Sequence, residues 1–173
     1  EVIGVQVKDM GAGSWSFKAD NLDTELLEGQ EYRDMATRLR GSVMLMGPLI
    51  ARLGKAVMPQ PGGDKIGRRR LDTHFNGFCK LGVDVKYDGP TSSYLLKAGK
   101  MKGSDLLLEE ASVTGTANLL MLAVLTPGRT SIFNAACEPY LQQLSKMLIR
   151  MGAKITGLGS NLLIIEGVDE LGG

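Results

Sequence analysis

The chain has 173 residues, a formal net charge of +1, 43% hydrophobic residues and 23% charged residues. This length suffices for one domain with its own core, and the composition is that of a globular protein. The near-neutral charge excludes a global attraction to nucleic acid or to a membrane, so any electrostatic function must be local. One histidine and two cysteines without metal-ligand spacing argue against a disulfide framework, and we expect no protein-held metal and a reducing, cytoplasmic location.

The pattern of the first 32 residues predicts that they form the end of a structural unit. Glu1 is not a natural start, so we expect the chain to be a fragment of a longer protein. Its sequence shows no signal peptide and no apolar run of membrane-spanning length. Residues 2–7 and 15–18 alternate loosely between apolar and polar side chains, which predicts a β-hairpin. Residues 21–32 are acidic and polar, and we expect them to form a connection.

The next segment is expected to be helical. Apolar residues recur every three or four positions over residues 34–53, which predicts one helix. Gly47-Pro48 would kink or divide this helix, because proline removes a backbone donor and clashes with the preceding turn. Gly54 would end the helix. Residues 56–58 then predict a short buried strand that leads into a glycine-rich loop.

The rest of the chain predicts alternating helices and strands. The expected elements are, in order, a helix over 71–81, strands over 83–87, 94–96 and 101–108, a helix over 116–125, a strand over 130–133, a helix that opens at Cys137-Glu138-Pro139, and strands over 154–155 and 162–165. The buried stripe of the last helix would consist of Leu141, Leu144, Met147, Leu148 and Met151. Cys79 and Cys137 are expected to be core or near-core thiols.

An internal repeat organises these elements. Residues 81–85, Leu-Gly-Val-Asp-Val, match residues 151–155, Met-Gly-Ala-Lys-Ile, at a separation of 70 residues. Both follow an expected helix and precede two expected strands, so the sequence predicts repeated βαβαββ units of the α/β (α+β) class. We expect one partial domain, in which residues 1–33 end a first unit, 34–108 form a second and 109–173 form a third.

The loop over residues 60–74 carries most of the chemistry that the sequence offers. It combines three glycines with the carboxylate of Asp64 and with the cations Lys65, Arg68, Arg69 and Arg70. Glycine lets backbone approach a ligand, and arginine holds phosphate or carboxylate through charge-assisted hydrogen bonds. This predicts an anion site with one acid/base group, and Asp72 is placed to cap the following helix. The alternative is a solvated surface run or a weak nucleic-acid patch.

Several spaced motifs, in the same order, resemble the enolpyruvyl transferases, and in particular the branch that acts on UDP-N-acetylglucosamine. These motifs are Arg38-Leu39-Arg40-Gly41-Ser42 with Gly47-Pro48-Leu49, the loop Pro61-Gly62-Gly63-Asp64-Lys65-Ile66-Gly67 with Arg69, Asp72 and His74, Ser112-Val113, and Asn134-Ala135-Ala136-Cys137-Glu138-Pro139. The resemblance runs from about Val5 to the end. It implies an inside-out α/β barrel with helices inside and sheets facing solvent, of which this chain holds an incomplete part.

The resemblance also implies an activity. It is the transfer of the enolpyruvyl group from phosphoenolpyruvate to UDP-N-acetylglucosamine with release of phosphate, the first committed step of peptidoglycan synthesis. No cofactor is implied, and the implied partners are the two substrates and the missing second domain of the same enzyme. Two alternatives stay open: a non-catalytic sugar-nucleotide or phosphate-binding module, and an enzyme like enolpyruvylshikimate-phosphate synthase. Nucleic-acid binding is disfavoured by the neutral charge and the few aromatic residues.

Carried over by position, the resemblance assigns roles to single residues. Asp64 stands where most of the family has the loop cysteine that fosfomycin alkylates, which implies an acid/base role and fosfomycin resistance. The residues that would bind substrates are Arg40, Arg69, Leu71, Asp72, Thr73, His74, Ser112, Val113 and Thr114. The sequence departs from the family pattern at three positions, where Arg70 replaces a common proline, Gly41 a common alanine and Glu110 a frequent nucleotide-contacting lysine. Lys102, Arg68 or Arg70 would then supply the missing charge.

Overall fold

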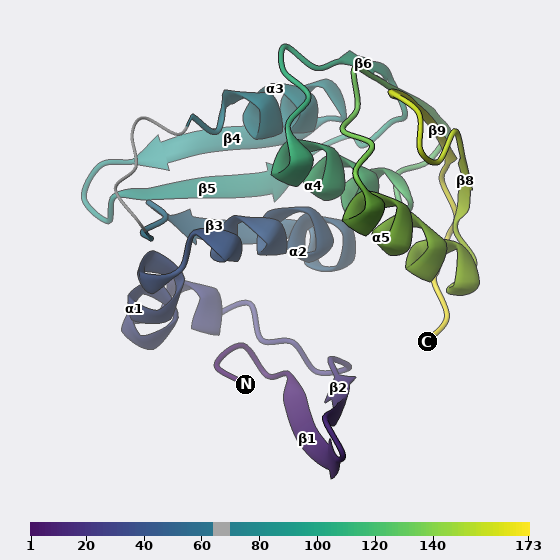
Figure 1. Cartoon of the computed structure of the whole chain (residues 1–173). Coiled ribbons are helices and arrows are strands. Elements are labelled where there is room, and N and C mark those ends of the chain that lie inside the picture. Colours follow the sequence, from purple (N-terminus) through teal and green to yellow (C-terminus); the bar gives the residue numbers. More distant parts are fainter. Residues whose placement is uncertain (64–69) are drawn as a thin grey trace.

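The computed structural model describes residues 1–63 and 70–173 (Figure 1). The α-helices are α1 (Gln30–Arg38), α2 (Met46–Leu53), α3 (Asp72–Lys80), α4 (Val113–Ala123) and α5 (Pro139–Arg150), and the 3-10 helices are η1 (Leu26–Glu28) and η2 (Arg40–Leu45). The strands are β1 (Gln6–Gly11), β2 (Ser14–Lys18), β3 (Lys55–Pro59), β4 (Val83–Asp88), β5 (Ser93–Ala98), β6 (Asp105–Leu107), β7 (Arg129–Phe133), β8 (Lys154–Thr156) and β9 (Leu162–Glu166).

The strands form a hairpin and two larger sheets. The hairpin pairs β1 with β2, a three-stranded sheet has the order β3-β5-β4, and a four-stranded sheet has the order β6-β7-β9-β8. All pairs are antiparallel except β6 with β7. The strand expected over residues 101–108 is therefore shorter than predicted, and it pairs with β7 in the second sheet. The chain from β6 onward runs strand, helix, strand, helix, strand, strand.

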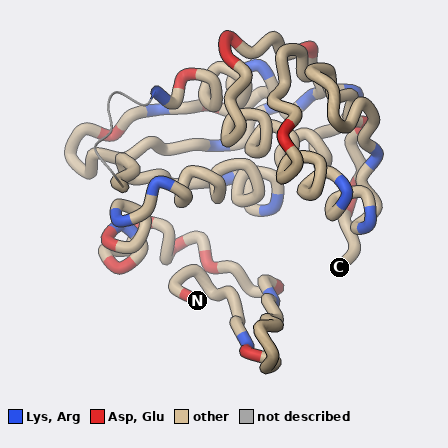
Figure 2. Tube along the Cα trace, in the orientation of Figure 1, with Lys and Arg blue, Asp and Glu red and all other residues tan. Residues whose placement is uncertain are grey.

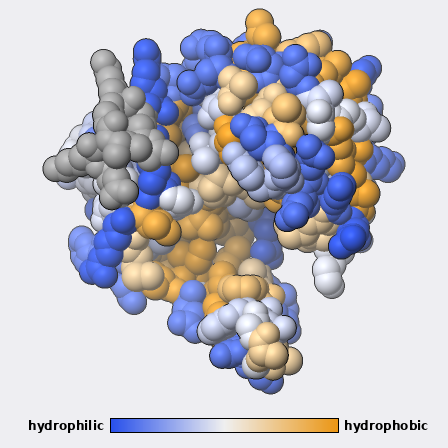
Figure 3. Space-filling view, viewed as in Figure 1, coloured by the Kyte–Doolittle hydropathy of each residue, from blue (hydrophilic) through white to orange (hydrophobic). Residues whose placement is uncertain are grey.

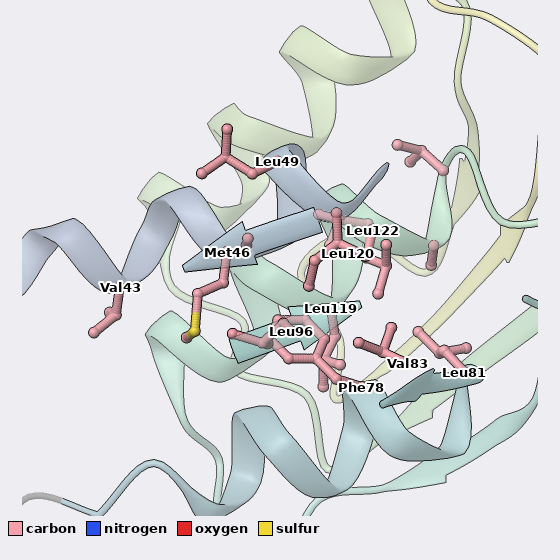
Figure 4. Close-up of a cluster of buried hydrophobic side chains, with 14 of the residues drawn as sticks. Val43, Met46, Leu49, Phe78, Leu81, Val83, Leu96, Leu119, Leu120 and Leu122 are labelled. Atoms are coloured by element: carbon pink, nitrogen blue, oxygen red, sulfur yellow. The ribbon is translucent and has the colours of Figure 1, made fainter. Parts of the chain in front are cut away.

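Helices fill the interior between these sheets. Helix α4 is the most enclosed, since every residue from Gly115 to Leu120 is buried, and it contacts α2, α3 and α5. Figure 4 shows Leu119 and Leu120 of this helix among Phe78, Leu96 and other apolar side chains of the core. Fully burying one such side chain stabilises a fold by about 1.5–3 kcal/mol. Exposed and buried residues alternate on the short strands β6 and β8, whereas β3 has four consecutive buried residues. The elements form a mixed α/β fold, and the inside-out barrel expected from the sequence stays a prediction.

The single helix predicted over residues 34–53 is wrong, because the chain folds there into α1, η2 and α2. Leu39 is extended, with φ −129° and ψ 123°, and ends α1. The Ser42 hydroxyl lies 2.8 Å from the Ala36 carbonyl oxygen and 2.7 Å from that of Leu39, so it satisfies backbone acceptors that the break leaves open. Pro48 does not cause the break. It lies in the first turn of α2, where proline is tolerated.

The internal repeat is visible in equivalent helix ends. Gly82 has φ +92° and Gly152 has φ +106°, a left-handed region that glycine adopts without strain. Each donates its N–H over 3.0 Å to the carbonyl three residues earlier, Gly82 to Cys79 and Gly152 to Ile149. The 70-residue spacing of the sequence therefore corresponds to a repeated turn between helix and strand.

Three expectations about burial are wrong. Cys79 and Cys137 are exposed free thiols rather than core residues, and Met147 has an exposed fraction of 51%. On α5 the buried face includes Ser145 instead, whose hydroxyl donates to the Leu141 carbonyl oxygen at 2.8 Å. The hydroxyl is thus hydrogen-bonded inside its own helix. This bond offsets the free-energy cost of burying a polar group in an apolar contact face.

The hairpin β1–β2 extends away from the rest of the structure (Figure 1). Trp15 and Phe17 on this hairpin are 57% and 70% exposed. Hydrophobic side chains gather where the hairpin faces α1 (Figure 3), and a groove of about 410 Å³ there is lined by Val2, Ile3, Val5, Val7, Phe17, Tyr32, Met35, Ala36, Leu39 and Leu45, among others. Lysines, arginines, aspartates and glutamates are interspersed along the whole trace (Figure 2). Within the described residues no helix combines the length and the apolar character needed to cross a bilayer.

Candidate functional site

A pocket of about 450 Å³ lies beside the glycine-rich loop. Its lining residues are Arg40, Gln60, Pro61, Arg70, Leu71, Asp72, Phe75 and Tyr94. Three of them, Arg40, Leu71 and Asp72, are predicted substrate-binding residues from two separate stretches of the sequence. The pocket combines two guanidinium groups with the rings of Phe75 and Tyr94, whose centroids are 4.5 Å apart. It can therefore accept a ligand that has both an anionic and an apolar part.

The loop leaves β3 in close contact with the segment that carries Arg40. A Cβ on Gly62 would lie 1.6 Å from the Thr37 carbonyl oxygen, and a Cβ on Gly63 would lie 3.1 Å from Cβ of Arg40. Gly63 also has φ +89°, so both positions require glycine, one for space and one for conformation. The predicted acid/base residue Asp64 and the predicted phosphate ligand Arg69 lie outside the described residues, and their roles stay predictions.

Asp72 does not cap α3 as predicted. The N-cap position is Leu71, and Asp72 is the first helical residue. Its carboxylate instead pairs with Nε of Arg70. An acidic side chain in the first turn of a helix is still favoured by the helix dipole. The pair brings Arg70, which departs from the family pattern, to the rim of the pocket.

The first turns of α3 and α4 meet at Thr73, which follows the pocket residues Leu71 and Asp72 in the chain. The Thr73 hydroxyl donates to Oε1 of Glu110 at 3.3 Å, and a Cβ on Gly115 would lie 3.0 Å from Cγ2 of Thr73. Ser112 caps α4, because its hydroxyl accepts the N–H of Gly115 at 3.2 Å. Thr73 and Ser112, predicted from separate motifs, are thus neighbours across the helix junction. Their helix N-termini point positive dipole ends into the same region.

His74 lies deeper than its predicted ligand role implies. Its exposed fraction is 2%, its Nδ1 is 3.0 Å from Nδ2 of Asn118, and its Nε2 is 3.2 Å from the Thr114 hydroxyl. Burial, and then the positive charge of Arg40, lower the pKa of His74 to about 4, so the ring is neutral near pH 7. Both ring nitrogens are used inside the protein.

Of the remaining predicted residues, Val113 is partly buried and Thr114 is exposed. Together with Ser112 they form the start of α4, next to α3. Asn118, which the sequence analysis did not single out, lies at the centre of this region with no exposed surface. An available signal was its polarity within an otherwise apolar helical run. Among the described residues no group of three or more His, Cys, Asp or Glu is placed to hold a metal ion.

The fold and this site define the class of protein. Residues 7–173 match the model of the EPSP synthase (3-phosphoshikimate 1-carboxyvinyltransferase) family, and the chain belongs to that family. Solved structures agree on the fold: EPSP synthase from Acinetobacter baumannii superposes with a TM-score of 0.67 at 21% identity, over 99% of this chain and 38% of that one. The enolpyruvyl transferase NikO from Streptomyces tendae gives a TM-score of 0.67 at 17% identity, over 96% of this chain and 38% of that one.

Among curated proteins the chain is similar to UDP-N-acetylglucosamine 1-carboxyvinyltransferases. It is 59% identical over 171 residues to the enzyme from Bacteroides thetaiotaomicron, and the aligned region covers 99% of this chain and 39% of the relative. It is 54% identical over 171 residues to the enzyme from Porphyromonas gingivalis, again over 99% of this chain and 39% of the relative. The resemblance seen in the sequence motifs is confirmed. The chain spans about two fifths of the length of these relatives.

Proposed function

We propose that the chain is part of an enzyme that transfers the enolpyruvyl group from phosphoenolpyruvate to the 3-hydroxyl of UDP-N-acetylglucosamine and releases phosphate. The observation that carries this proposal is the 59% identity to a UDP-N-acetylglucosamine 1-carboxyvinyltransferase over 171 residues. Within a family that includes other acceptors, this identity favours the nucleotide sugar over shikimate 3-phosphate. The product would enter peptidoglycan synthesis.

The geometry of the site supports an anionic substrate. Arg40 and Arg70 line one pocket, and the starts of α3 and α4 meet at Thr73, the residue after Asp72 of that pocket. Guanidinium groups and helix N-termini both stabilise phosphate through charge-assisted hydrogen bonds. We assign the diphosphate to the Ser112–Thr114 turn and the uridine end to the segment from Leu71 to Thr73. Arg69 would join Arg40 in neutralising phosphate as the reaction proceeds.

Asp64 is the proposed acid/base residue. Addition of the sugar hydroxyl to C2 of phosphoenolpyruvate requires a proton to be delivered to C3, and elimination of phosphate from C2 requires a proton to be removed from C3. A carboxyl group can transfer these protons when its pKa is raised towards neutrality. The backbone next to it is closely packed, since Gly62 and Gly63 lie against Thr37 and Arg40.

The direct test is an assay of phosphate release by the full-length enzyme that contains this chain. We expect release to depend on both phosphoenolpyruvate and UDP-N-acetylglucosamine, and to fall at least about 100-fold in Asp64→Asn, the range that general acid–base groups contribute. Asp84→Asn, an exposed aspartate on β4, is the matched control. Release that requires shikimate 3-phosphate instead would contradict the proposed acceptor.

A second candidate is a sugar-nucleotide or phosphate-binding module that does not turn over. It is favoured for the isolated chain because this chain spans only 39% of the first relatives' length. Calorimetric titration with UDP-N-acetylglucosamine tests it, with Arg69→Ala expected to lose binding and Asp64→Ala expected to keep it. Phosphate release by the isolated chain would refute the non-catalytic alternative.

We further propose that the chain forms two βαβαββ units and the end of a third in an inside-out barrel, in a cytoplasmic enzyme. The apolar groove between the hairpin and α1 supports this, because contiguous exposed apolar surface of this kind is normally covered by a partner. The second domain of the longer protein, or its remaining barrel unit, is the expected cover. Hydrogen exchange of residues 35–45 should be slower in the longer protein than in the isolated chain.

A further inference from the structure

Asn118 connects three helical segments through one side chain. It extends from α4, has no exposed surface, and its Oδ1 accepts the N–H of Gly47 at 2.9 Å while its Nδ2 donates to the Val43 carbonyl oxygen at 2.9 Å. These two backbone partners determine the orientation of the amide, because an N–H can only donate and a carbonyl can only accept. Nδ2 therefore also donates to Nδ1 of His74, 3.0 Å away.

This orientation determines the tautomer of His74. Nδ1 accepts from Asn118, so the proton of the neutral ring lies on Nε2. Nε2 then donates to the Thr114 hydroxyl at 3.2 Å. The hydrogen bonds form a continuous chain from η2, through α4 and α3, back to the exposed start of α4. All of its buried members are satisfied, which is the condition under which a buried polar network stabilises one arrangement.

We propose that Asn118 is a positioning residue, which acts through neutral His74 to hold the start of α4 in register with η2 and the start of α3. Val43 belongs to the same short helix as Arg40, and Gly47 lies in the first turn of α2. A Cβ on Gly47 would lie 2.4 Å from the Asn118 carbonyl oxygen, so the two helices touch at this point. Moving α4 would displace the Ser112–Thr114 turn relative to η2, the helix that carries Arg40.

The charges around His74 favour its neutral form. Burial lowers the pKa of the ring, and the positive charge of Arg40 on η2 lowers it further. Asp72, on the same helix as His74, forms an ion pair with Arg70. Glu110, which precedes α4, accepts a hydrogen bond from Thr73. Protonation of Nδ1 would set an N–H against the donor Nδ2 of Asn118, so the chain of hydrogen bonds exists only with a neutral ring. Asn118→Asp reverses this, because a carboxylate can only accept and would attract a proton to Nδ1.

The experiment uses nitrogen-15 NMR, and His74 is the one histidine of the sequence, so its ring signals need no separation. In the wild-type chain we expect the Nε2–H tautomer, with no titration above pH 5. In Asn118→Asp we expect the proton on Nδ1, a His74 pKa raised above its usual value, and shifted amide signals for residues 112–115. Asn118→Ala, which removes the donor without adding charge, should shift the same amides. It replaces the aspartate variant if that one does not fold.

The control is Asn76→Asp, the same change at an exposed asparagine of α3 whose amide faces Glu109. It should leave the ring tautomer and the amides of residues 112–115 unchanged. An Nδ1–H tautomer in the wild type, a ring that titrates near its usual pKa, or unshifted 112–115 amides in folded Asn118 variants would each overturn the proposal.

The consequence for ligand binding rests on the proposed function. Affinity for UDP-N-acetylglucosamine should fall about fivefold or more in the Asn118 variants, the size expected for coupling through a packed network. Wild-type affinity in a variant whose ring tautomer has changed would overturn the positioning role. A wild-type protein that binds no sugar nucleotide would count against the proposed function alone, because the NMR result is independent of the ligand.

Discussion

Gly62 lies so close to Thr37 that a Cβ on residue 62 would be 1.6 Å from the Thr37 carbonyl oxygen. The contact joins the start of the glycine-rich loop to the end of α1, 25 residues earlier in the sequence. A backbone contact of this kind cannot be relieved by rotating a side chain, so any larger residue must displace one of the two segments. The loop that leads to Asp64 is therefore anchored at a position where only glycine fits.

Gly62→Ala should destabilise the chain by about 1–3 kcal/mol, the usual cost of inserting a methyl group into filled space. In the longer enzyme it should also lower phosphate release at least about tenfold, because displacement of the loop moves the reacting groups. Urea unfolding and the phosphate assay measure the two effects. Gly89→Ala is the control, since a Cβ there would meet nothing within 4 Å. Equal stability of the two variants would refute the close contact.

Neighbouring leucines on β6 should differ sharply in their contribution to stability. Leu106 is 1% exposed and Leu107 is 69% exposed. We expect Leu106→Ala to lower the free energy of unfolding by about 2–5 kcal/mol, because it leaves a cavity in the core. Leu107→Ala should change it by less than about 0.5 kcal/mol. Chemical unfolding of both variants checks this. A larger loss of stability in Leu107→Ala than in Leu106→Ala would mean that the assignment of buried and exposed side chains on β6 is wrong.

Stability should depend on pH through His74. Burial lowers its pKa from 6.5 to about 4 in the folded chain. The stabilisation is fully present above pH 6.5. As pH falls from 6.5 to 4, the unfolded chain binds a proton that the folded chain does not, and stability decreases by up to about 1.4 kcal/mol per pH unit. Unfolding curves of the wild type and His74→Gln from pH 7 to 4 measure the difference. If the free energy of unfolding depended on pH with the same slope in both proteins, a buried neutral ring would be contradicted.

Glu110 should weaken the binding of an anionic ligand. It accepts a hydrogen bond from Thr73 beside the Ser112 turn, so its negative charge lies next to the proposed phosphate site. Glu110→Gln should tighten UDP-N-acetylglucosamine binding about two- to fivefold, since an exposed charge contributes up to about 1 kcal/mol. Glu109→Gln provides the adjacent control. Titration at two salt concentrations should show a smaller gain at high salt, and weaker binding in Glu110→Gln would place the phosphates elsewhere.

Fosfomycin should inhibit Asp64→Cys but not the wild-type enzyme. A thiolate attacks an epoxide readily, whereas a carboxylate is a weak nucleophile at this carbon. Mass spectrometry of the longer protein should show one adduct on residue 64. Cys79 and Cys137 are exposed thiols, so the same variant with both replaced by serine tests whether the adduct is at the loop. Inhibition of the wild type would overturn the expected resistance.

Part of the site could be predicted from spaced motifs. Arg40, Leu71 and Asp72 were assigned from separate stretches, and they line one pocket. Thr73 and Ser112 were likewise assigned separately, and their helices meet. The depth of His74 and the buried contacts of Asn118 could not be predicted. A polar residue in a helical run is compatible with a solvated face or a buried network, and only its partners distinguish the two.

Elements with local signals can be predicted from the sequence. Gly54 and Gly82 end helices at positive φ, Pro139 opens α5, and the 70-residue repeat recurs as equivalent turns. Three features depend on contacts between distant segments and emerge only in the folded chain: the break at Leu39, the sheet that β6 joins, and the exposure of Cys79. The physical reason is the range of the interactions. A helix end depends on backbone conformation within one turn, whereas strand pairing and burial depend on segments that lie far apart in the sequence.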